Sequence, residues 1–94
     1  MPIATIELTE RFKRDFKRLD PVLQLRVQDI LADQLIPWPT RGALRHHTLS
    51  GIKPPVHVLD VVGNHSHQIT FQLNGDVATL LRVGTHREID RTPI

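Results

Sequence analysis

The chain has 94 residues, of which 39% are hydrophobic and 23% charged, and its formal net charge is +2. These values are typical of one small globular domain with a modest core, and they exclude an intrinsically disordered chain. The sequence contains no cysteine, which excludes disulfide bonds and thiolate zinc sites.

No apolar run approaches the roughly 18 residues needed to cross a bilayer. The N-terminal residues MPIATIEL also lack the basic region and long apolar run of a signal peptide. We therefore expect a single domain over residues 1–94, located in the cytoplasm and without a membrane partner. Nine of the twelve cationic side chains are arginine, which binds phosphate and carboxylate groups in a bidentate fashion and so favours an anionic partner.

The first part of the chain predicts a strand followed by a helix. Residues 3–8 (IATIEL) carry apolar side chains broken by Thr and Glu, as in a short strand. Thr9 is a favourable N-cap residue for a helix that runs to about Leu19. Phe12, Phe16 and Leu19 lie at i, i+4 and i+7, so they form the buried stripe of this helix.

A second helix is predicted to begin at Asp20-Pro21. Aspartate caps a helix, and proline is tolerated at the first helical position because its missing N–H would have no partner there. The helix ends before Pro37, and its apolar face comprises Leu23, Val27, Ile30, Leu31 and Leu35. Residues Trp38 to Pro55 show no periodicity, which predicts a loop, with at most one short turn.

After this loop the hydrophobic period changes to that of strands. The three strand candidates are Val56–Val62, His67–Leu73 and Val77–Val83. Asn74-Gly75 between the last two is a strong hairpin signal, because the favoured two-residue turn needs positive φ angles. The three runs therefore predict an antiparallel meander.

The predicted fold class is α+β, in the order strand, helix, helix, strand, strand, strand, with the helical hairpin on one face of the sheet. Strand alternation places Gln68, Thr70 and Arg82 on the other face, which we expect to be partly open. Gly84 is expected to end the last strand, so that His86 can turn toward this open face.

Three short motifs and this element order resemble one protein family. The motifs are HTLSG at 47–51, HSHQITFQLNG at 65–75 and LLRVGTHREIDR at 80–91. Together they resemble the RelE/ParE superfamily of type II toxin–antitoxin toxins, and most closely its YafQ-like branch. The resemblance implies two helices against a curved sheet, a cognate antitoxin as partner, and no metal or other cofactor. It also implies one of two activities, which are cleavage of mRNA on the ribosome and inhibition of DNA gyrase.

Cleavage of RNA without a metal requires a group that deprotonates the 2′-hydroxyl, a group that protonates the leaving oxygen, and positive charge near the phosphate. Histidine can act as base or acid near neutral pH, and arginine matches the phosphate oxygens. The chain has both residue types in the matching motifs, so we expect an endoribonuclease that inhibits translation.

The resemblance implies roles for individual residues. His86 matches the histidine of Gly-Thr-His and His47 the histidine before Leu-x-Gly, so both are candidates for proton transfer, and His67 would assist them. Arg82 matches a basic position of the family and is a candidate for phosphate binding, as is Arg87.

Two further positions depart from the family pattern. Gln68 stands where RelE has an arginine, and it is a further candidate for phosphate binding. Asp90 stands where the mRNA-cleaving toxins usually have an aromatic ring that stacks on a nucleobase. The rings of His65 and His67 are candidates to replace it.

Other interpretations remain open at this point. Strict alternation points His67 toward the helices, and Arg82 could simply pair with Asp60 or Asp90. His65 and His67 could hold zinc together with His47, His86 or Asp90, but the family uses no metal, so we expect none. A gyrase inhibitor of the ParE type and an inactive antitoxin-binding protein are the alternative functions.

Overall fold

The computed structural model describes residues 3–32, 46–49, 51–52, 55–61 and 66–93, with the side chains of residues 46 and 47 left aside. The elements in chain order are β1 (Thr5–Leu8), α1 (Glu10–Lys17), α2 (Pro21–Ile30), β2 (His46–Leu49), β3 (Val56–Asp60), β4 (His67–Asn74), β5 (Val77–Thr85) and α3 (His86–Arg91). The predicted α+β class and the predicted order of the first two helices and last three strands are confirmed.

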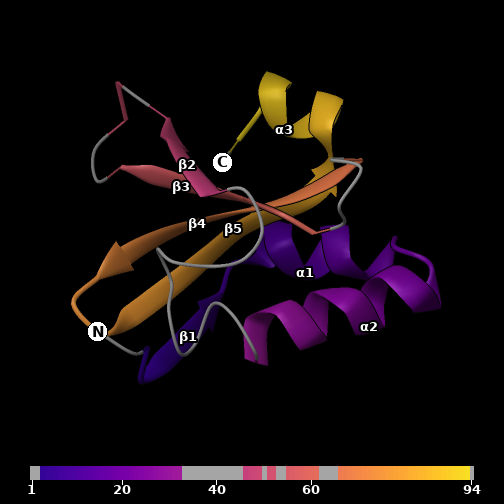
Figure 1. The fold of residues 1–94 in the computed structure, drawn as a ribbon, viewed down its shortest axis with the longest axis horizontal. Helices are drawn as coiled ribbons and strands as arrows, with labels where there is room; N and C mark the ends of the chain where they lie inside the picture. Colours follow the sequence, from indigo (N-terminus) through magenta and orange to yellow (C-terminus); the bar gives the residue numbers. More distant parts are fainter. Residues whose placement is uncertain (1–2, 33–45, 50, 53–54, 62–65, 94) are drawn as a thin grey trace.

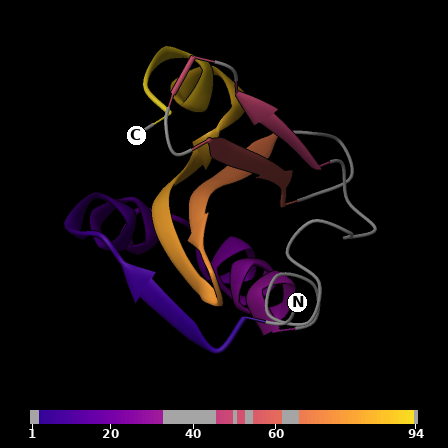
Figure 2. The same cartoon turned by 90° about the vertical axis from the view of Figure 1, so that its left-hand side faces the viewer.

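The strands form one five-stranded sheet in the order β1-β5-β4-β3-β2 (Figure 1). Strands β2 to β5 pair antiparallel in sequence order, which confirms the predicted meander and extends it by β2. Strand β1 pairs with β5 in parallel, so the sheet is mixed. The quarter-turn view shows how strongly the sheet curves (Figure 2).

Both predicted N-caps are present, and the two helices cover one face of the sheet. Phe12 N–H donates to the side chain of Thr9 at the start of α1, and Leu23 N–H donates to Asp20 at the start of α2. Helix α1 ends two residues earlier than expected, at Lys17. The core contains side chains from both helices and the sheet, including Phe12, Val27, Ile30, Ile69, Phe71, Leu80 and Val83, with Phe16, Leu19 and Leu31 packed against it.

Thr9 also fixes how the chain passes from β1 to α1. Its backbone N–H and its hydroxyl both donate to the carbonyl of Leu80, at 3.2 and 2.9 Å, and the hydroxyl reaches Leu81 O at 3.1 Å. Helix α1 therefore starts against the middle of β5. It continues past the point where β1 stops pairing with that strand.

The β4–β5 hairpin turns one residue later than the sequence indicated. Asn74 pairs with Val77, so the two turn residues are Gly75 and Asp76 rather than Asn74 and Gly75. Gly75 has a φ of 61°, a conformation that glycine adopts without the steric cost of a Cβ atom.

A bulge in β5 changes which of its side chains face the helices. Thr70 pairs with Arg82 but Phe71 pairs with Leu80, so Leu81 is an extra residue. Ala78 and Leu80 precede the bulge and lie in the core, as does Val83 after it. Strict alternation would place Ala78 and Leu80 on the same face as Arg82 and away from the core, and it is therefore wrong for this strand.

Two elements were not predicted. Strand β2 lies within the stretch expected to be a loop, and α3 follows β5 directly. Helix α3 lies across the sheet from the α1–α2 hairpin (Figure 1). It contacts β4 and β5, and the chain end after it folds back, so that Thr70 donates to Pro93 O at 2.7 Å.

The face expected to be open is closed at the predicted residues. Gln68, Thr70 and Arg82 are all buried, and Arg82 is only 4% exposed. Each has a protein partner: the Gln68 amide donates to Asp60 Oδ1 at 3.0 Å, and Thr70 contacts the chain end. The open-face prediction is therefore wrong, because these polar groups form hydrogen bonds with the segment after α3 and with two buried carboxylates.

The partner of Arg82 is Asp15 of α1. Arg82 Nε and Nη2 donate to the two carboxylate oxygens of Asp15 at 2.9 and 3.0 Å, which is a bidentate pair. Asp15 Oδ2 also accepts from Val83 N–H at 3.3 Å, and Arg82 Nη1 donates to Thr92 O at 3.0 Å. Hydrogen bonding to Asp15 raises the pKa of Arg82 above its ordinary value. The pairing with Asp60 or Asp90 considered from the sequence does not occur.

Removing one partner of this pair should destabilise the protein strongly. The variant Asp15→Leu leaves the Arg82 charge buried without its carboxylate, which costs on the order of 3–5 kcal/mol. Urea denaturation would measure this loss, with Asp29→Ala on exposed α2 surface as the control for removing an aspartate. The double variant Asp15→Leu/Arg82→Met should recover much of the loss, because no charge is then buried. Equal stability of Asp15→Leu and Asp29→Ala would contradict the assignment.

Candidate active site at the end of β5

Helix α3 begins with a capping box that fixes the end of β5. Thr85 Oγ1 accepts from Glu88 N–H at 3.2 Å, and Glu88 Oε1 accepts from Thr85 N–H and from its hydroxyl, both at 3.0 Å. This arrangement is the reciprocal cap of the Thr-x-x-Glu pattern. The sequence carries that pattern in THRE, and it is the signal from which α3 could have been predicted.

Gly84 has a different role from the one predicted. It does not end the strand, since β5 continues to Thr85 and Gly84 pairs with Gln68. A Cβ atom at Gly84 would lie 3.2 Å from Glu88 Oε1. Glycine at this position therefore leaves space for the capping carboxylate.

His86 is the first residue of α3, and its imidazole is 54% exposed. Its Nδ1 lies 2.9 Å from Oδ2 of Asp90, one helical turn further along. Its backbone N–H donates to Ser66 O at 3.1 Å, which attaches the start of α3 to the residue before β4. His86 is thus presented to solvent on a well-anchored backbone.

His67 lies in the neighbouring strand, opposite Thr85. Its Nδ1 is 3.0 Å from the Ser66 hydroxyl. The ring lines a polar pocket of about 240 Å³, which is also lined by Asp15, Arg18, Leu19, Val83, Gly84, Thr85 and Glu88. The prediction that alternation points His67 toward the helices is confirmed, because this pocket includes three residues from α1 and the turn after it.

The remaining candidates fall into two groups. Arg87 is exposed on α3 beside His86, as are Asp90 and Arg91. His47 is in β2 with its backbone opposite Val58, but its side chain and the whole of His65 lie outside the described residues. The structure therefore brings His86, His67, Arg87 and Asp90 to one end of the sheet.

Arg82 and Gln68 do not join this group as phosphate-binding residues. Both are buried, and their polar groups bond to Asp15, Thr92 and Asp60. Sequence reasoning missed Asp15, which lies on α1 three residues after Phe12 and, like it, is buried. Asp15 could have been found from the sequence, because a carboxylate on the buried side of an amphipathic helix needs a charged or hydrogen-bonding partner.

Within the described residues there is no cluster of three or more histidine, aspartate or glutamate side chains that could hold a metal ion. Nor does any described helix have the length and apolar character needed to cross a membrane.

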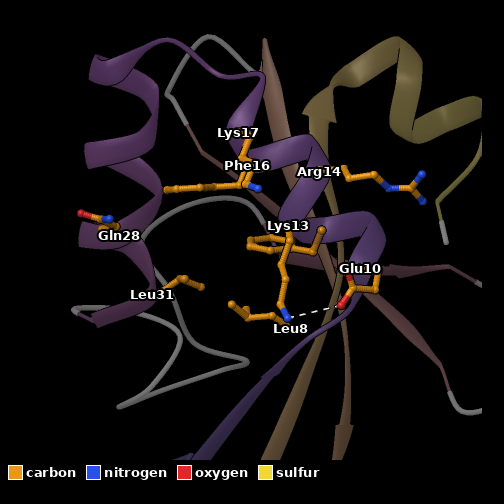
Figure 3. A pocket seen from close by; sticks show the side chains of 9 residues that line it. Leu8, Glu10, Lys13, Arg14, Phe16, Lys17, Gln28 and Leu31 are labelled. Carbon is orange, nitrogen blue, oxygen red and sulfur yellow. Dashed lines mark hydrogen bonds and ion pairs between the residues drawn. The ribbon is translucent and has the colours of Figure 1, made fainter.

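A second hollow, of about 390 Å³, lies between β1, α1 and α2 (Figure 3). In that view Leu8 of β1, Phe16 of α1 and Leu31, directly after α2, lie around it, and Lys13 forms an ion pair with Glu10 at 3.4 Å. The lining residues are Leu8, Glu10, Phe12, Lys13, Arg14, Phe16, Lys17, Gln28 and Leu31. This α1–α2 groove therefore combines apolar side chains with three cations and one carboxylate.

Comparison with solved structures identifies the fold. The chain superimposes on the RelBE2 toxin–antitoxin complex from Mycobacterium tuberculosis with a TM-score of 0.72 at 17% identity, covering 92% of this chain and 93% of that one. It matches the YoeB dimer from Staphylococcus aureus with a TM-score of 0.72 at 11% identity, covering 92% and 99%. For the DinJ–YafQ complex from Escherichia coli the TM-score is 0.62 at 21% identity, covering 89% and 94%.

The domain thus has the fold of the RelE/ParE-type toxins, YafQ among them, as the sequence motifs predicted. No protein-family model matches the sequence, and no curated protein matches it either.

The capping carboxylate gives a pH-dependent prediction. Hydrogen bonds from the Thr85 backbone and side chain lower the pKa of Glu88, with a smaller contribution from Arg82 and Arg18. Because the pKa of Glu88 is lower in the folded protein, its carboxylate stabilises the fold at pH values above the ordinary pKa of 4.5. This stabilisation is lost as the pH falls through the pKa that Glu88 has in the folded protein. We expect the Thr85 amide resonance to report loss of the cap below pH 4.5.

The variant Glu88→Gln should retain the cap, because glutamine also accepts the Thr85 N–H, but it should show no such titration. Glu10→Gln, in the first turn of α1, is the matched control and should leave the Thr85 titration unchanged. A Thr85 resonance that titrates identically in Glu88→Gln would contradict this prediction.

Proposed function

We propose that this protein is the toxin of a type II toxin–antitoxin system and that it cleaves mRNA on the ribosome in the cytoplasm, which inhibits translation. The observation that carries the proposal is His86, an exposed imidazole held at the end of β5 in a RelE-type fold, with Arg87 beside it. The proposed reaction uses no metal or other cofactor.

In the proposed reaction, His86 takes the proton from a 2′-hydroxyl as that oxygen attacks the adjacent phosphorus. The bond from phosphorus to the 5′-oxygen breaks, and this oxygen takes a proton from a second group. The products are a 2′,3′-cyclic phosphate and a 5′-hydroxyl. Imidazole suits both proton transfers because its ordinary pKa lies near neutral pH.

Three residues are assigned supporting roles. His47 is the candidate for the second proton-transfer group, and Arg87 for charge stabilisation at the phosphate, which a solvent-exposed guanidinium can reach. His67 lies one strand away from Thr85 and is assigned to positioning rather than to direct proton transfer, because its ring lines the pocket on the α1 side.

A second candidate function is inhibition of DNA gyrase, as in ParE-type toxins. One observation favours it: the sequence has no aromatic residue after Phe71, so no phenyl, phenol or indole ring follows β4 to stack on a nucleobase. Gyrase inhibition would leave mRNA intact and would not depend on His86.

The two functions are separated by expression without the antitoxin. Expression should arrest translation, and His86→Ala should relieve the arrest, since general acid–base catalysis contributes about 10²- to 10⁴-fold to the rate. Arg87→Ala should weaken cleavage more than Arg91→Ala, which changes an exposed arginine on the same helix. Primer extension on mRNA from the induced cells measures the cleavage. Arrest that persists in both His86→Ala and His47→Ala, with intact mRNA, would exclude this nuclease.

The α1–α2 groove is the surface that we assign to the antitoxin. Its apolar residues and its excess of cations, Lys13, Arg14 and Lys17 against Glu10, complement an amphipathic segment that carries acidic side chains. Toxins of this fold occur in complexes with their antitoxins, as the RelBE2 and DinJ–YafQ structures illustrate for those proteins.

A matched pair of leucine variants tests this surface. Leu8 lines the groove, whereas Leu25 is an exposed leucine on α2 outside it. Leu8→Glu should weaken binding of the antitoxin by about tenfold or more, because it places a carboxylate in the apolar part of the groove. Leu25→Glu should bind it normally, and both variants should retain RNA cleavage. Calorimetry with the protein encoded by the adjacent gene would measure the affinities, and a larger loss for Leu25→Glu would contradict the assignment.

A further inference from the structure

The contact between His86 and Asp90 leaves one imidazole nitrogen available. Nδ1 is 2.9 Å from Asp90 Oδ2, and an ionised carboxylate can only accept a hydrogen bond. Nδ1 must therefore carry the proton in this contact. Nε2 lies on the opposite side of the ring, points away from Asp90, and contacts no hydrogen-bond partner among the residues that the structure describes.

Helix stability does not explain this pair. His86 lies in the first turn of α3, where the helix dipole disfavours a positively charged histidine. Asp90 lies in the last turn, where the dipole disfavours a carboxylate. The reverse order, with the acid before the base, is the more stabilising one at i, i+4. Both side chains are also more than half exposed, at 54% and 62%, where an ion pair contributes little.

Contacts that anchor helix α3 hold the backbone of this pair in place. Glu88 caps the helix from within it, His86 N–H bonds to Ser66 O, and Ile89 is buried against the sheet. Residues 86 and 90 therefore share the outer face of an anchored helix one turn apart. Among the residues that the structure describes, Asp90 is the side chain on that face that contacts the His86 ring.

We propose that Asp90 is a positioning residue that fixes His86 as the Nδ1–H tautomer, with the Nε2 lone pair directed to the RNA. This inference rests on the proposed nuclease function for its consequence, which is that Nε2 accepts the 2′-hydroxyl proton. After that transfer the carboxylate stabilises the imidazolium. A base that is oriented by a third group in this way is the general arrangement of activated nucleophile sites.

Asp90 thereby has a purpose at a position where the toxins that this sequence resembles usually have a stacking ring. The carboxylate cannot stack on a nucleobase, but it can orient the base that removes the proton. The substrate would then be held through its phosphates, by Arg87, more than through a nucleobase at this position.

Long-range ¹H–¹⁵N NMR of the purified protein tests the tautomer directly, at mildly alkaline pH where free imidazole is neutral. His86 should be the Nδ1–H form in the wild type and should shift toward the Nε2–H form in Asp90→Ala. Asp90→Glu should restore the Nδ1–H form, since a glutamate at i+4 also reaches the ring. Asp29→Ala, which removes an exposed aspartate from α2, should leave the His86 signals unchanged.

Cleavage kinetics on ribosome-bound mRNA provide the second readout. Asp90→Ala should lower kcat by about tenfold or more with little change in KM, because RNA binding is retained while the base is misoriented. Asp90→Glu should recover most of the activity. An Nε2–H ring in the wild type, or an unchanged kcat in Asp90→Ala, would overturn the proposal.

The two readouts also separate this inference from the proposed function. An Nδ1–H ring that depends on Asp90, in a wild-type protein that leaves RNA intact, would support the positioning role and overturn the nuclease. Cleavage that requires His86 but not Asp90 would support the nuclease and overturn the positioning role of Asp90.

Discussion

The buried pair between Asp15 and Arg82 is the interaction on which the rest of the structure depends. Through two oxygens and three nitrogens it connects α1, the free edge of β5 after Leu80, and the backbone that follows α3. Asp15 lies 67 residues from Arg82 in sequence, and α1 could not move away from β5 without leaving both buried charges unpaired. The guanidinium that pairs with this charge on the first helix also donates to Thr92 O, so it connects the segment after α3 to the same buried site.

The candidate site is a consequence of that arrangement. The bulge at Leu81 returns Val83 to the core, β5 runs on to Thr85, and the capping box turns the chain at once into α3. His86 is exposed because it is the first residue of this helix, yet its backbone is bonded to Ser66. A rigid backbone that carries an exposed imidazole is what proton transfer to a bound polymer requires.

The sequence allowed much of the fold to be predicted, because caps, periodicity and the hairpin signal are local. Thr9, Asp20 and the alternation of His67 to Leu73 illustrate this. The bulge, strand β2 and the closure of the supposed open face depend on contacts between distant residues, and Arg82 illustrates the difference. Its parity suggested a solvent-facing side chain and the family resemblance a phosphate ligand, and only the approach of α1 shows that a carboxylate 67 residues away neutralises it. The histidine motifs directed attention to the end of the sheet where His86, His67, Arg87 and Asp90 lie, but the pairing of His86 with Asp90 follows from α3, which was not predicted.

Asp15 and Arg82 have structural roles, and we assign the chemistry to the exposed groups of α3, which we propose cleave RNA without a metal. The most direct test is to incubate the purified protein with ribosome-bound mRNA and to identify the new ends by mass spectrometry. Attack by the 2′-hydroxyl predicts 2′,3′-cyclic phosphate and 5′-hydroxyl ends. Ends with a 3′-hydroxyl and a 5′-phosphate, or mRNA that remains intact, would contradict the account.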